Sequence, residues 1–295
     1  MSAFHSQEEA LRRNAAGRPV RQVSVLDPLS GINRGLLRIP KSLDLFAVYL
    51  DRIAAAAGPG LIVAAGFMTR HFTPRLLEVA GGYADTVAQT RARKKARLLV
   101  LSDFRGERPE IRYNELAYGG VTYRQHPGVF SGNHIDYATQ FLLTVWEKVE
   151  SGLSTPTSIL DIACGNGIIG DQLLRRYSEA RLTATDDSLL AVRSAKMNLP
   201  ADRSRILYDH TLDQVVDRSI DLVVSNPPFH FGHENNIDVS LGLFRQARRV
   251  LREGGSLVVV ANRHLNYATH LEKLFRATTV AETDKYVVYR ADKVG

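Results

Sequence analysis

Cysteine and long apolar runs are what this 295-residue sequence lacks. Its single cysteine, Cys164, cannot form an intramolecular disulfide or frame a cysteine-based metal site, which argues against a disulfide-stapled secreted domain. The longest apolar run, Leu61 to Met68, is far shorter than the roughly 20 residues that cross a bilayer. The polar N-terminal stretch has no signal-peptide core. These absences predict a cytoplasmic protein.

The charge of the chain is distributed unevenly along it. Residues 1–110 contain 17 Lys and Arg against 10 Asp and Glu, and residues 111–295 contain 21 of each, which together give the totals of 38 and 31. The densest cluster is Arg91, Arg93, Lys94, Lys95 and Arg97. This asymmetry favours an anionic partner, such as nucleic acid, for the N-terminal part, although a solvated loop explains the cluster equally well.

Two domains are predicted, with a boundary near Glu110. Residues 1–110 alternate helical and apolar strand-like segments, which predicts a smaller basic α/β domain. Residues 111–295 show a regular alternation. The predicted strands there are 158–162, 181–185, 206–207, 220–225 and 255–260, and the predicted helices are 137–150, 168–176, 188–198 and 239–250. Apolar strands separated by helices predict a Rossmann-like parallel sheet, which residues 279–290 close as an antiparallel hairpin.

A glycine-rich loop, Asp161-Ile-Ala-Cys-Gly-Asn-Gly167, joins a predicted strand to a predicted helix. Glycines in such a turn allow a nucleoside cofactor to approach the backbone closely. The residues predicted to contact the cofactor here are Asp161, Cys164, Gly165, Asn166 and Gly167. Asp186 ends the next strand and is predicted to bind the ribose hydroxyls. Asp187, beside it, is predicted to be an exposed helix cap.

Asp161 discriminates between two classes of cofactor. A carboxylate at this point repels the pyrophosphate of a dinucleotide. It attracts the ammonium group of S-adenosylmethionine, so the loop favours a methyl donor. The alternative is that Asp161 merely orders the loop by accepting hydrogen bonds from its backbone N–H groups.

The tetrapeptide Asn226-Pro227-Pro228-Phe229 follows another predicted strand and is predicted to be catalytic. The prolines fix the backbone, so the Asn226 amide oxygen and the Pro227 carbonyl can hold both hydrogens of an exocyclic amine. Holding them aims the nitrogen lone pair at the methyl group. Phe229 offers a face for base stacking. The alternative is a simple turn that ends the strand.

These motifs, with Val260-Ala-Asn-Arg-His-Leu265, resemble the bacterial ribosomal RNA guanine-N2 methyltransferases of the RsmC/RlmG type, with the large-subunit branch nearer. The resemblance implies a class I S-adenosylmethionine-dependent methyltransferase that acts on a guanine N2 amine, preceded by a degenerate methyltransferase-like domain that assists RNA binding. The sequence departs from the family at Ala163, where a glycine is usual, and in a shorter N-terminal part.

The family pattern adds two predicted contacts with the cofactor. Phe130 is expected to line the methionine end, and Asp209 the adenine amine, unless Asp209 is an exposed turn residue. Asn226 is also expected to border the cofactor. No metal is predicted, because His230, His233, Glu234 and Asp238 lie on a loop after the prolines and no cysteine assists them.

Two other functions fit the sequence less well. The same pair of acceptors would hold an amine of adenine or of a protein glutamine. A noncatalytic RNA-binding or ribosome-assembly factor would keep the fold and lose the cofactor, and Ala163 and the short N-terminal part keep this reading open.

Overall fold

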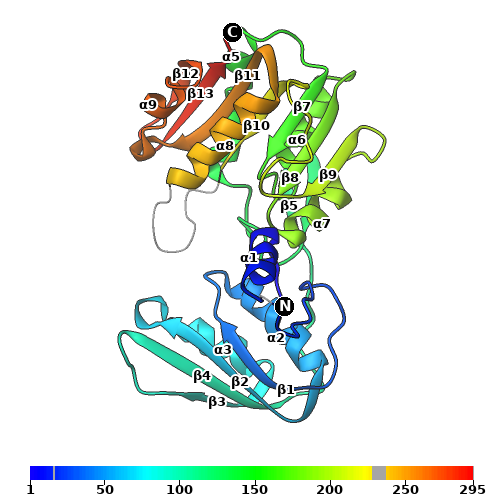
Figure 1. Ribbon diagram of the computed structural model, residues 1–295, viewed down its shortest axis with the longest axis vertical. Coiled ribbons are helices and arrows are strands. Elements are labelled where there is room, and N and C mark those ends of the chain that lie inside the picture. The colour runs from blue at the N-terminus through cyan, green and yellow to red at the C-terminus, as the bar shows by residue number, and fades with distance from the viewer. Residues whose placement is uncertain (16, 228–236, 295) are drawn as a thin grey trace. The chain divides into compact units, whose positions relative to one another are not determined.

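The computed structural model describes residues 1–15, 17–227 and 237–294, which form two compact units (Figure 1). The first unit comprises Met1–Ala3, Leu11–Tyr113 and His126–Val129, and the second comprises Phe4–Ala10, Asn114–Gln125 and Phe130 onward. This division differs from a single cut near Glu110, because Phe4–Ala10 belong to the second unit and His126–Val129 to the first. Helix α1 (His5–Ala15) therefore begins in one unit and continues into the other.

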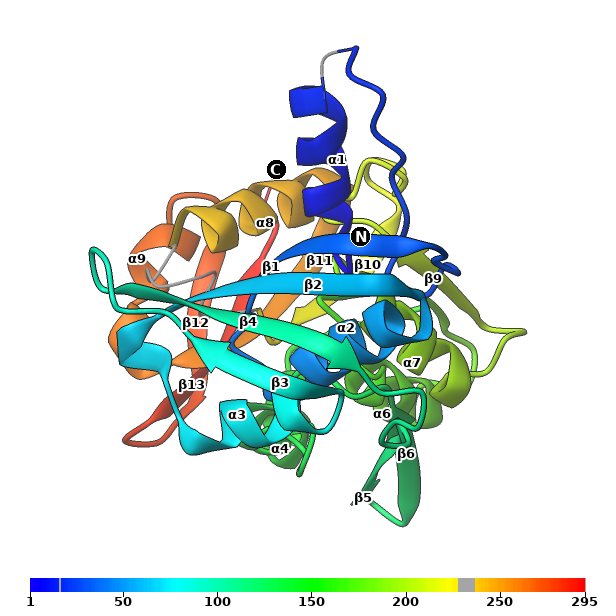
Figure 2. The ribbon, with the colours of Figure 1, turned by 90° about the horizontal axis from the view of Figure 1, so that it is seen from below.

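The first unit is built on a four-stranded sheet with the order β1-β2-β4-β3 (Figure 2). Its strands are β1 (Ile32–Arg38), β2 (Ala57–Met68), β3 (Ala84–Gln89) and β4 (Ala96–Phe104). Strands β1 and β2 are parallel, and the other pairs are antiparallel. The helices are α2 (Leu43–Ala55), the 3-10 turn η1 (Thr69–His71) and α3 (Pro74–Gly81). Side chains of α2 and α3 form one hydrophobic core with β2 and β4.

The second unit contains a seven-stranded sheet with the order β12-β13-β11-β10-β7-β8-β9 (Figure 1). The strands are β7 (Ser158–Ile162), β8 (Arg181–Asp186), β9 (Ser204–Tyr208), β10 (Ile220–Ser225), β11 (Leu251–Asn262), β12 (Arg276–Glu282) and β13 (Tyr286–Asp292). Strands β7 to β11 pair in parallel, and β12 and β13 run antiparallel at one edge. The predicted doubly wound sheet and its closing hairpin are confirmed.

Helices cover both faces of this sheet. Those of the second unit are α4 (Tyr137–Thr144), α5 (Trp146–Glu150), α6 (Ile168–Arg176), α7 (Leu189–Asn198), α8 (Ile237–Val250), the 3-10 turn η2 (Arg263–Leu265) and α9 (Ala268–Leu271). The helices from α4 to α7 share one core with the hairpin β5 (Asn114–Tyr118) and β6 (Val121–Gln125), and α8 and α9 share the other. The predicted helix 137–150 is interrupted at Val145, and Trp146 is buried.

The parallel strands bring the predicted motifs to one edge of the sheet. Strands β7, β8, β9 and β10 are neighbours, and each predicted acidic or amide residue lies at the carboxyl end of one of them or just beyond it. Ligands bind at this edge in open α/β sheets. Within the described ranges, no helix is long and apolar enough to span a bilayer.

Candidate functional site

The glycine loop after β7 turns sharply back against the end of β8. Gly165 and Gly167 have φ angles of +57° and +86°, in the left-handed region that glycine adopts without strain. The Cys164 N–H donates to the Thr185 carbonyl at 3.0 Å, and the Gly165 N–H donates to Asp186 Oδ2 at 2.9 Å. Burial raises the pKa of the Cys164 thiol well above its usual value, so this cysteine is an inert packing residue.

Asn166, another predicted cofactor contact, has its side chain turned into the protein. Its Nδ2 donates to Gln125 Oε1 at 2.9 Å, and its Oδ1 accepts from the Ile168 N–H at 3.2 Å. Gln125 is fully buried, and its own amide lies 3.4 Å from the Phe130 and Ser131 carbonyl oxygens. No sequence pattern predicts this link, because Gln125 belongs to no motif. It ties the glycine loop to the segment that starts at Phe130.

Asp161 is completely buried at the end of β7 with one of its oxygens unused. Oδ2 accepts from the Gly170 N–H at 3.1 Å, whereas Oδ1 has no hydrogen-bond partner. Burial raises the pKa of Asp161 to about 8, against the opposing effect of the Gly170 bond. A Cβ atom on Gly170 would lie 2.5 Å from Leu182 Cδ2, so a larger residue at this point of α6 would require the Leu182 side chain to move. Oδ2 of Asp161 therefore orders the loop, and Oδ1 is available to accept a hydrogen bond from a ligand.

Asp186 and Asp187 have different partners. Asp186 Oδ2 accepts from Gly165, and Oδ1 accepts from the Ser188 N–H at 2.7 Å. Burial raises the pKa of Asp186 to about 6, partly offset by these two bonds. The prediction that Asp187 is an exposed helix cap is wrong. Ser188 caps α7, and Asp187 is half-buried and accepts hydrogen bonds from Ser6, a partner 181 residues away that no local pattern reveals.

Asp209 lies just beyond β9 and is only 3% exposed, which contradicts the alternative of an exposed turn residue. Its Oδ1 accepts from the Thr211 N–H and hydroxyl, both at 2.8 Å, while Oδ2 is buried without a partner. Burial acts to raise the pKa of Asp209, but the hydrogen bonds from Thr211 and the Gln214 backbone, together with the charge of His5, outweigh it and hold the pKa below its usual value. The carboxylate is therefore ionised and has one oxygen available.

Asn226 follows β10 and is held by two acceptors. Its Nδ2 donates to Asp136 Oδ2 at 2.8 Å and to Thr139 Oγ1 at 2.9 Å. An ionised carboxylate only accepts hydrogen bonds, so Asp136 fixes which end of the amide faces it. Oδ1 of Asn226 is buried and has no partner. Pro227 is buried beside it, whereas Pro228, Phe229, His230, His233, Glu234 and the side chain of Asp238 lie outside the described residues.

These oxygens share a common property. Among the residues that the structure describes, three buried carboxylate or amide oxygens lack a hydrogen-bond donor: Oδ1 of Asp161, Oδ2 of Asp209 and Oδ1 of Asn226. Each belongs to a residue at or just beyond the carboxyl end of a parallel strand of the same sheet. Buried acceptors of this kind are rare, because an unmade hydrogen bond is costly. The edge is therefore suited to a ligand that is rich in N–H donors.

Phe130 is 69% exposed, which is unusual for a large apolar side chain. It begins the second unit's segment before α4, and its carbonyl oxygen faces the Gln125 amide. Its predicted role as a wall for the methionine end of the cofactor stays a prediction.

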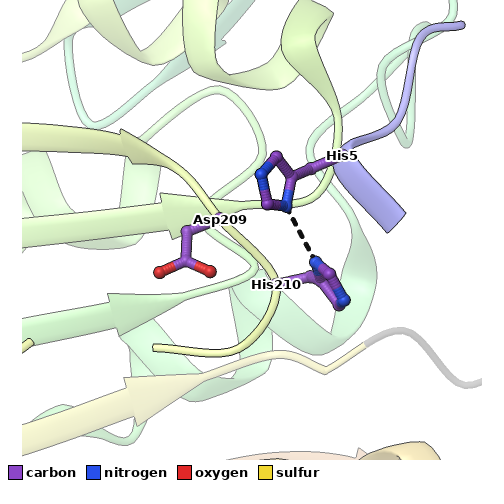
Figure 3. Close-up of side chains that lie close together, drawn as sticks. All are labelled: His5, Asp209 and His210. Carbon is purple, nitrogen blue, oxygen red and sulfur yellow. Dashed lines mark hydrogen bonds between the residues drawn. The ribbon is translucent and has the colours of Figure 1, made fainter. Parts of the chain in front are cut away.

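One group of potential metal ligands exists among the described residues, namely His5, Asp209 and His210 (Figure 3). The two imidazole Nδ1 atoms are 2.9 Å apart, at hydrogen-bond distance. Two nitrogen ligands of a tetrahedral zinc ion would be about 3.3 Å apart. We therefore interpret the two imidazoles as sharing a proton. No sequence pattern predicts this cluster, because His5 is remote from every motif.

Comparison with known proteins identifies both units. The methyltransferase small domain model matches residues 120–290, and the RLMG N-terminal domain model matches residues 1–105. A relative from Shewanella sp. (strain MR-4), ribosomal RNA large subunit methyltransferase G, is 32% identical over 88% of this chain and 70% of its own length. The protein of the same name from Psychromonas ingrahamii is 30% identical over 88% and 69%.

A solved structure shares the fold. The T. thermophilus 16S rRNA N2 G1207 methyltransferase, in complex with AdoMet and guanosine, aligns with a TM-score of 0.82 at 22% identity, covering 99% of this chain and 81% of its own. The predicted class I methyltransferase fold, with its separate N-terminal domain, is confirmed.

Ala163 has a φ of +60°, a left-handed conformation that costs a residue with a Cβ about 1 to 2 kcal/mol. We expect Ala163→Gly to raise the free energy of unfolding by up to about 1 kcal/mol, because relief of strain exceeds the entropy that glycine adds to the unfolded chain. Urea unfolding followed by the fluorescence of Trp146 measures this. The control, Ala195→Gly in the interior of α7, should be destabilised. A loss of stability in Ala163→Gly would contradict the expected strain.

Proposed function

The chain belongs to the ribosomal RNA large subunit methyltransferase G family, and on that basis we propose that it methylates the exocyclic N2 amine of a guanine in large-subunit ribosomal RNA. Its cofactor is S-adenosylmethionine, which supplies an electrophilic methyl group on a sulfonium. The observation that carries the assignment of the amine is the unpaired Oδ1 of Asn226. A ribosomal substrate places the enzyme in the cytoplasm.

The three unpaired oxygens fit the donors that this reaction brings together. We assign Oδ1 of Asp161 to the cofactor ammonium and Oδ2 of Asp209 to the adenine amine. Asp186 would accept from the ribose hydroxyls, while Cys164, Gly165 and Gly167 line the loop beneath them. Opposite charges bind Asp161 to the ammonium, and burial away from water strengthens that attraction.

Asn226 would act on the substrate amine. Its Oδ1 and the Pro227 carbonyl accept the two amine hydrogens, which directs the nitrogen lone pair at the methyl carbon. The new N–C bond forms as the S–C bond breaks, and the amine then loses one proton to water. Pro228 is assigned to fixing the backbone, and Phe229 to stacking on the base.

Binding of RNA is assigned in part to the turn between β3 and β4. Residues 91–95 are all exposed, and Arg93 pairs with Ala96 to close the turn. Lys94 and Lys95 adopt φ angles of +48° and +63°, so the turn has a defined shape. A compact row of cations at the tip of a hairpin is suited to phosphate contacts.

Transfer of labelled methyl groups from S-adenosylmethionine to separated small- and large-subunit RNAs, naked and assembled, tests the proposal directly. Nucleoside analysis should identify N2-methylguanosine in the large-subunit RNA. Methylated adenosine, or label in protein alone, would replace the proposed substrate with the adenine or glutamine amine. Failure to bind the cofactor would favour the assembly-factor alternative.

Asn226→Ala should reduce kcat by at least about a hundredfold and leave the Kd for S-adenosylmethionine within about threefold, because it removes an acceptor that orients the amine. Asp136→Asn is a second variant, and it tests the orientation of the Asn226 amide alone. Asparagine still caps α4, but it no longer dictates the orientation of the Asn226 amide. We expect kcat to fall about tenfold with α4 intact. Wild-type turnover in Asn226→Ala would exclude the proposed role.

Binding of S-adenosylmethionine should release about one proton near pH 6.5. Asp161, with a pKa of about 8, is protonated in the free protein, and the cofactor amino group is also protonated at this pH. Pairing requires the ionised carboxylate, so affinity should rise almost tenfold from pH 6.5 to 7.5. Calorimetry in buffers of different ionisation enthalpy measures the released proton. Asp161→Asn should bind weakly with no proton release; an unchanged release would assign the proton elsewhere.

Arg91→Gln combined with Arg93→Gln should weaken RNA binding and lower the slope of log affinity against log salt by about 1 to 2. The Kd for S-adenosylmethionine should not change. Arg18→Gln with Arg21→Gln removes the same charge from two other exposed positions of the first unit and is the matched control. Equal losses in the two double variants would mean that only net charge matters, and would contradict a specific role for the hairpin.

A further inference from the structure

The first residues of the chain pack against the end of strand β8 in the second unit. Phe4 forms an antiparallel bridge with Ser188, and the His5 N–H donates to the Asp187 carbonyl at 2.8 Å. The Ser6 N–H and hydroxyl donate to Asp187 Oδ1 and Oδ2, both at 2.7 Å. Two donors on one carboxylate form charge-assisted bonds, which are the stronger kind. The start of the chain is thus fastened to the residue that directly follows Asp186.

The same segment also contacts the residues on both sides of Asp209. The Tyr208 hydroxyl donates to Glu8 Oε1 at 3.1 Å, and the His5 ring meets the Tyr208 ring edge-on with centroids 5.0 Å apart. On the other side of Asp209, Nδ1 of His5 lies 2.9 Å from Nδ1 of His210 (Figure 3). One ring nitrogen of each histidine and one carboxylate oxygen of Asp209 lie within 4.8 Å of one another.

We propose that Phe4, His5, Ser6 and Glu8, here called the N-terminal clasp, form a wall of the pocket for the adenosine half of the cofactor. The inference rests on the proposed function, in which Asp186 accepts from the ribose and Asp209 from the adenine amine. The clasp holds Asp187, Tyr208 and His210, the immediate neighbours of these two acceptors. Nothing in the family motifs assigns a cofactor role to the start of the chain.

Ser6 is a positioning residue in this scheme. Asp186 receives hydrogen bonds from Gly165 and Ser188, so its carboxylate is set by the backbone on both sides of Asp187. Fixing the Asp187 side chain through Ser6 restrains that backbone. His5 differs, because a nitrogen of its ring lies within 4.8 Å of a carboxylate oxygen of the buried Asp209. The clasp should therefore affect the adenosine end and spare the methionine end.

Calorimetry on the full chain tests this with two ligands, S-adenosylmethionine and 5′-methylthioadenosine, which lacks the ammonium and carboxylate of the methionine part. We expect Ser6→Ala and His5→Ala each to weaken both ligands by about the same factor, roughly 3- to 30-fold. In turnover with RNA, KM for S-adenosylmethionine should rise by a similar factor while kcat at saturation changes less than twofold. Ser6→Thr keeps the hydroxyl and should restore binding.

Three controls separate positioning from loss of folding. Ser178→Ala removes an exposed hydroxyl just before β8, at the opposite edge of the sheet, and should change neither Kd. Asp187→Asn should weaken binding as Ser6→Ala does, and the double variant should be no weaker than either single one, because the two residues act through each other. Melting temperatures show whether any variant has lost its fold.

The outcomes are distinct. Equal affinity of wild type, Ser6→Ala and His5→Ala for both ligands overturns the clasp and leaves the proposed function standing. Weaker S-adenosylmethionine binding with unchanged 5′-methylthioadenosine binding also overturns it, because the effect would then lie at the methionine end. Failure of the wild-type chain to bind S-adenosylmethionine overturns the proposed function and the clasp with it.

Discussion

Three buried oxygens without donors are the constraint around which the second unit is arranged. Leaving one polar group unpaired costs about 1 to 3 kcal/mol, so Asp161, Asp209 and Asn226 together represent a considerable fraction of the stability of a domain. The proposed function supplies a donor for each of these oxygens, because the cofactor carries an ammonium group and an adenine amine and the substrate carries an exocyclic amine. Under that proposal, part of the stability that the free protein gives up is recovered as binding and orientation in the complex.

The surroundings of these oxygens explain why they stay unpaired. Each of the three side chains is held through its other end: Asp161 by Gly170, Asp209 by Thr211, and Asn226 by Asp136 and Thr139. A rigid anchor prevents the side chain from rotating to find a donor of its own. The backbone strain at Ala163 has a similar origin. The loop keeps a left-handed conformation at this residue although alanine adopts it at a cost in free energy.

The sequence predicted the second unit closely because its signals are local. Apolar runs and the glycines between them predict strands 158–162 and 220–225 and helix 168–176. The structure has these elements with the same bounds. Strands β1 and β3 were missed because both lie at the edges of their sheet and lack a continuous apolar run. The partners of Asp187 and Asn226 were missed for another reason, since Ser6 and Asp136 are 181 and 90 residues away. The residues at strand ends can be located from the sequence, whereas the distant side chains that contact them cannot.

Asp136 connects the start of a helix with the orientation of the Asn226 amide. Its Oδ2 accepts from the Thr139 N–H at the start of α4 and from Asn226 Nδ2, so one oxygen both caps a helix and orients the amide. With Nδ2 fixed in this way, the amide presents only an acceptor. An acceptor repels the carbonyl oxygens and ring nitrogen lone pairs of a base and favours a group with hydrogens to donate. Of the groups on a guanine, the N2 amine alone offers two hydrogens on one nitrogen. Under the proposed function, selectivity for an amine follows from a helix cap 90 residues before Asn226.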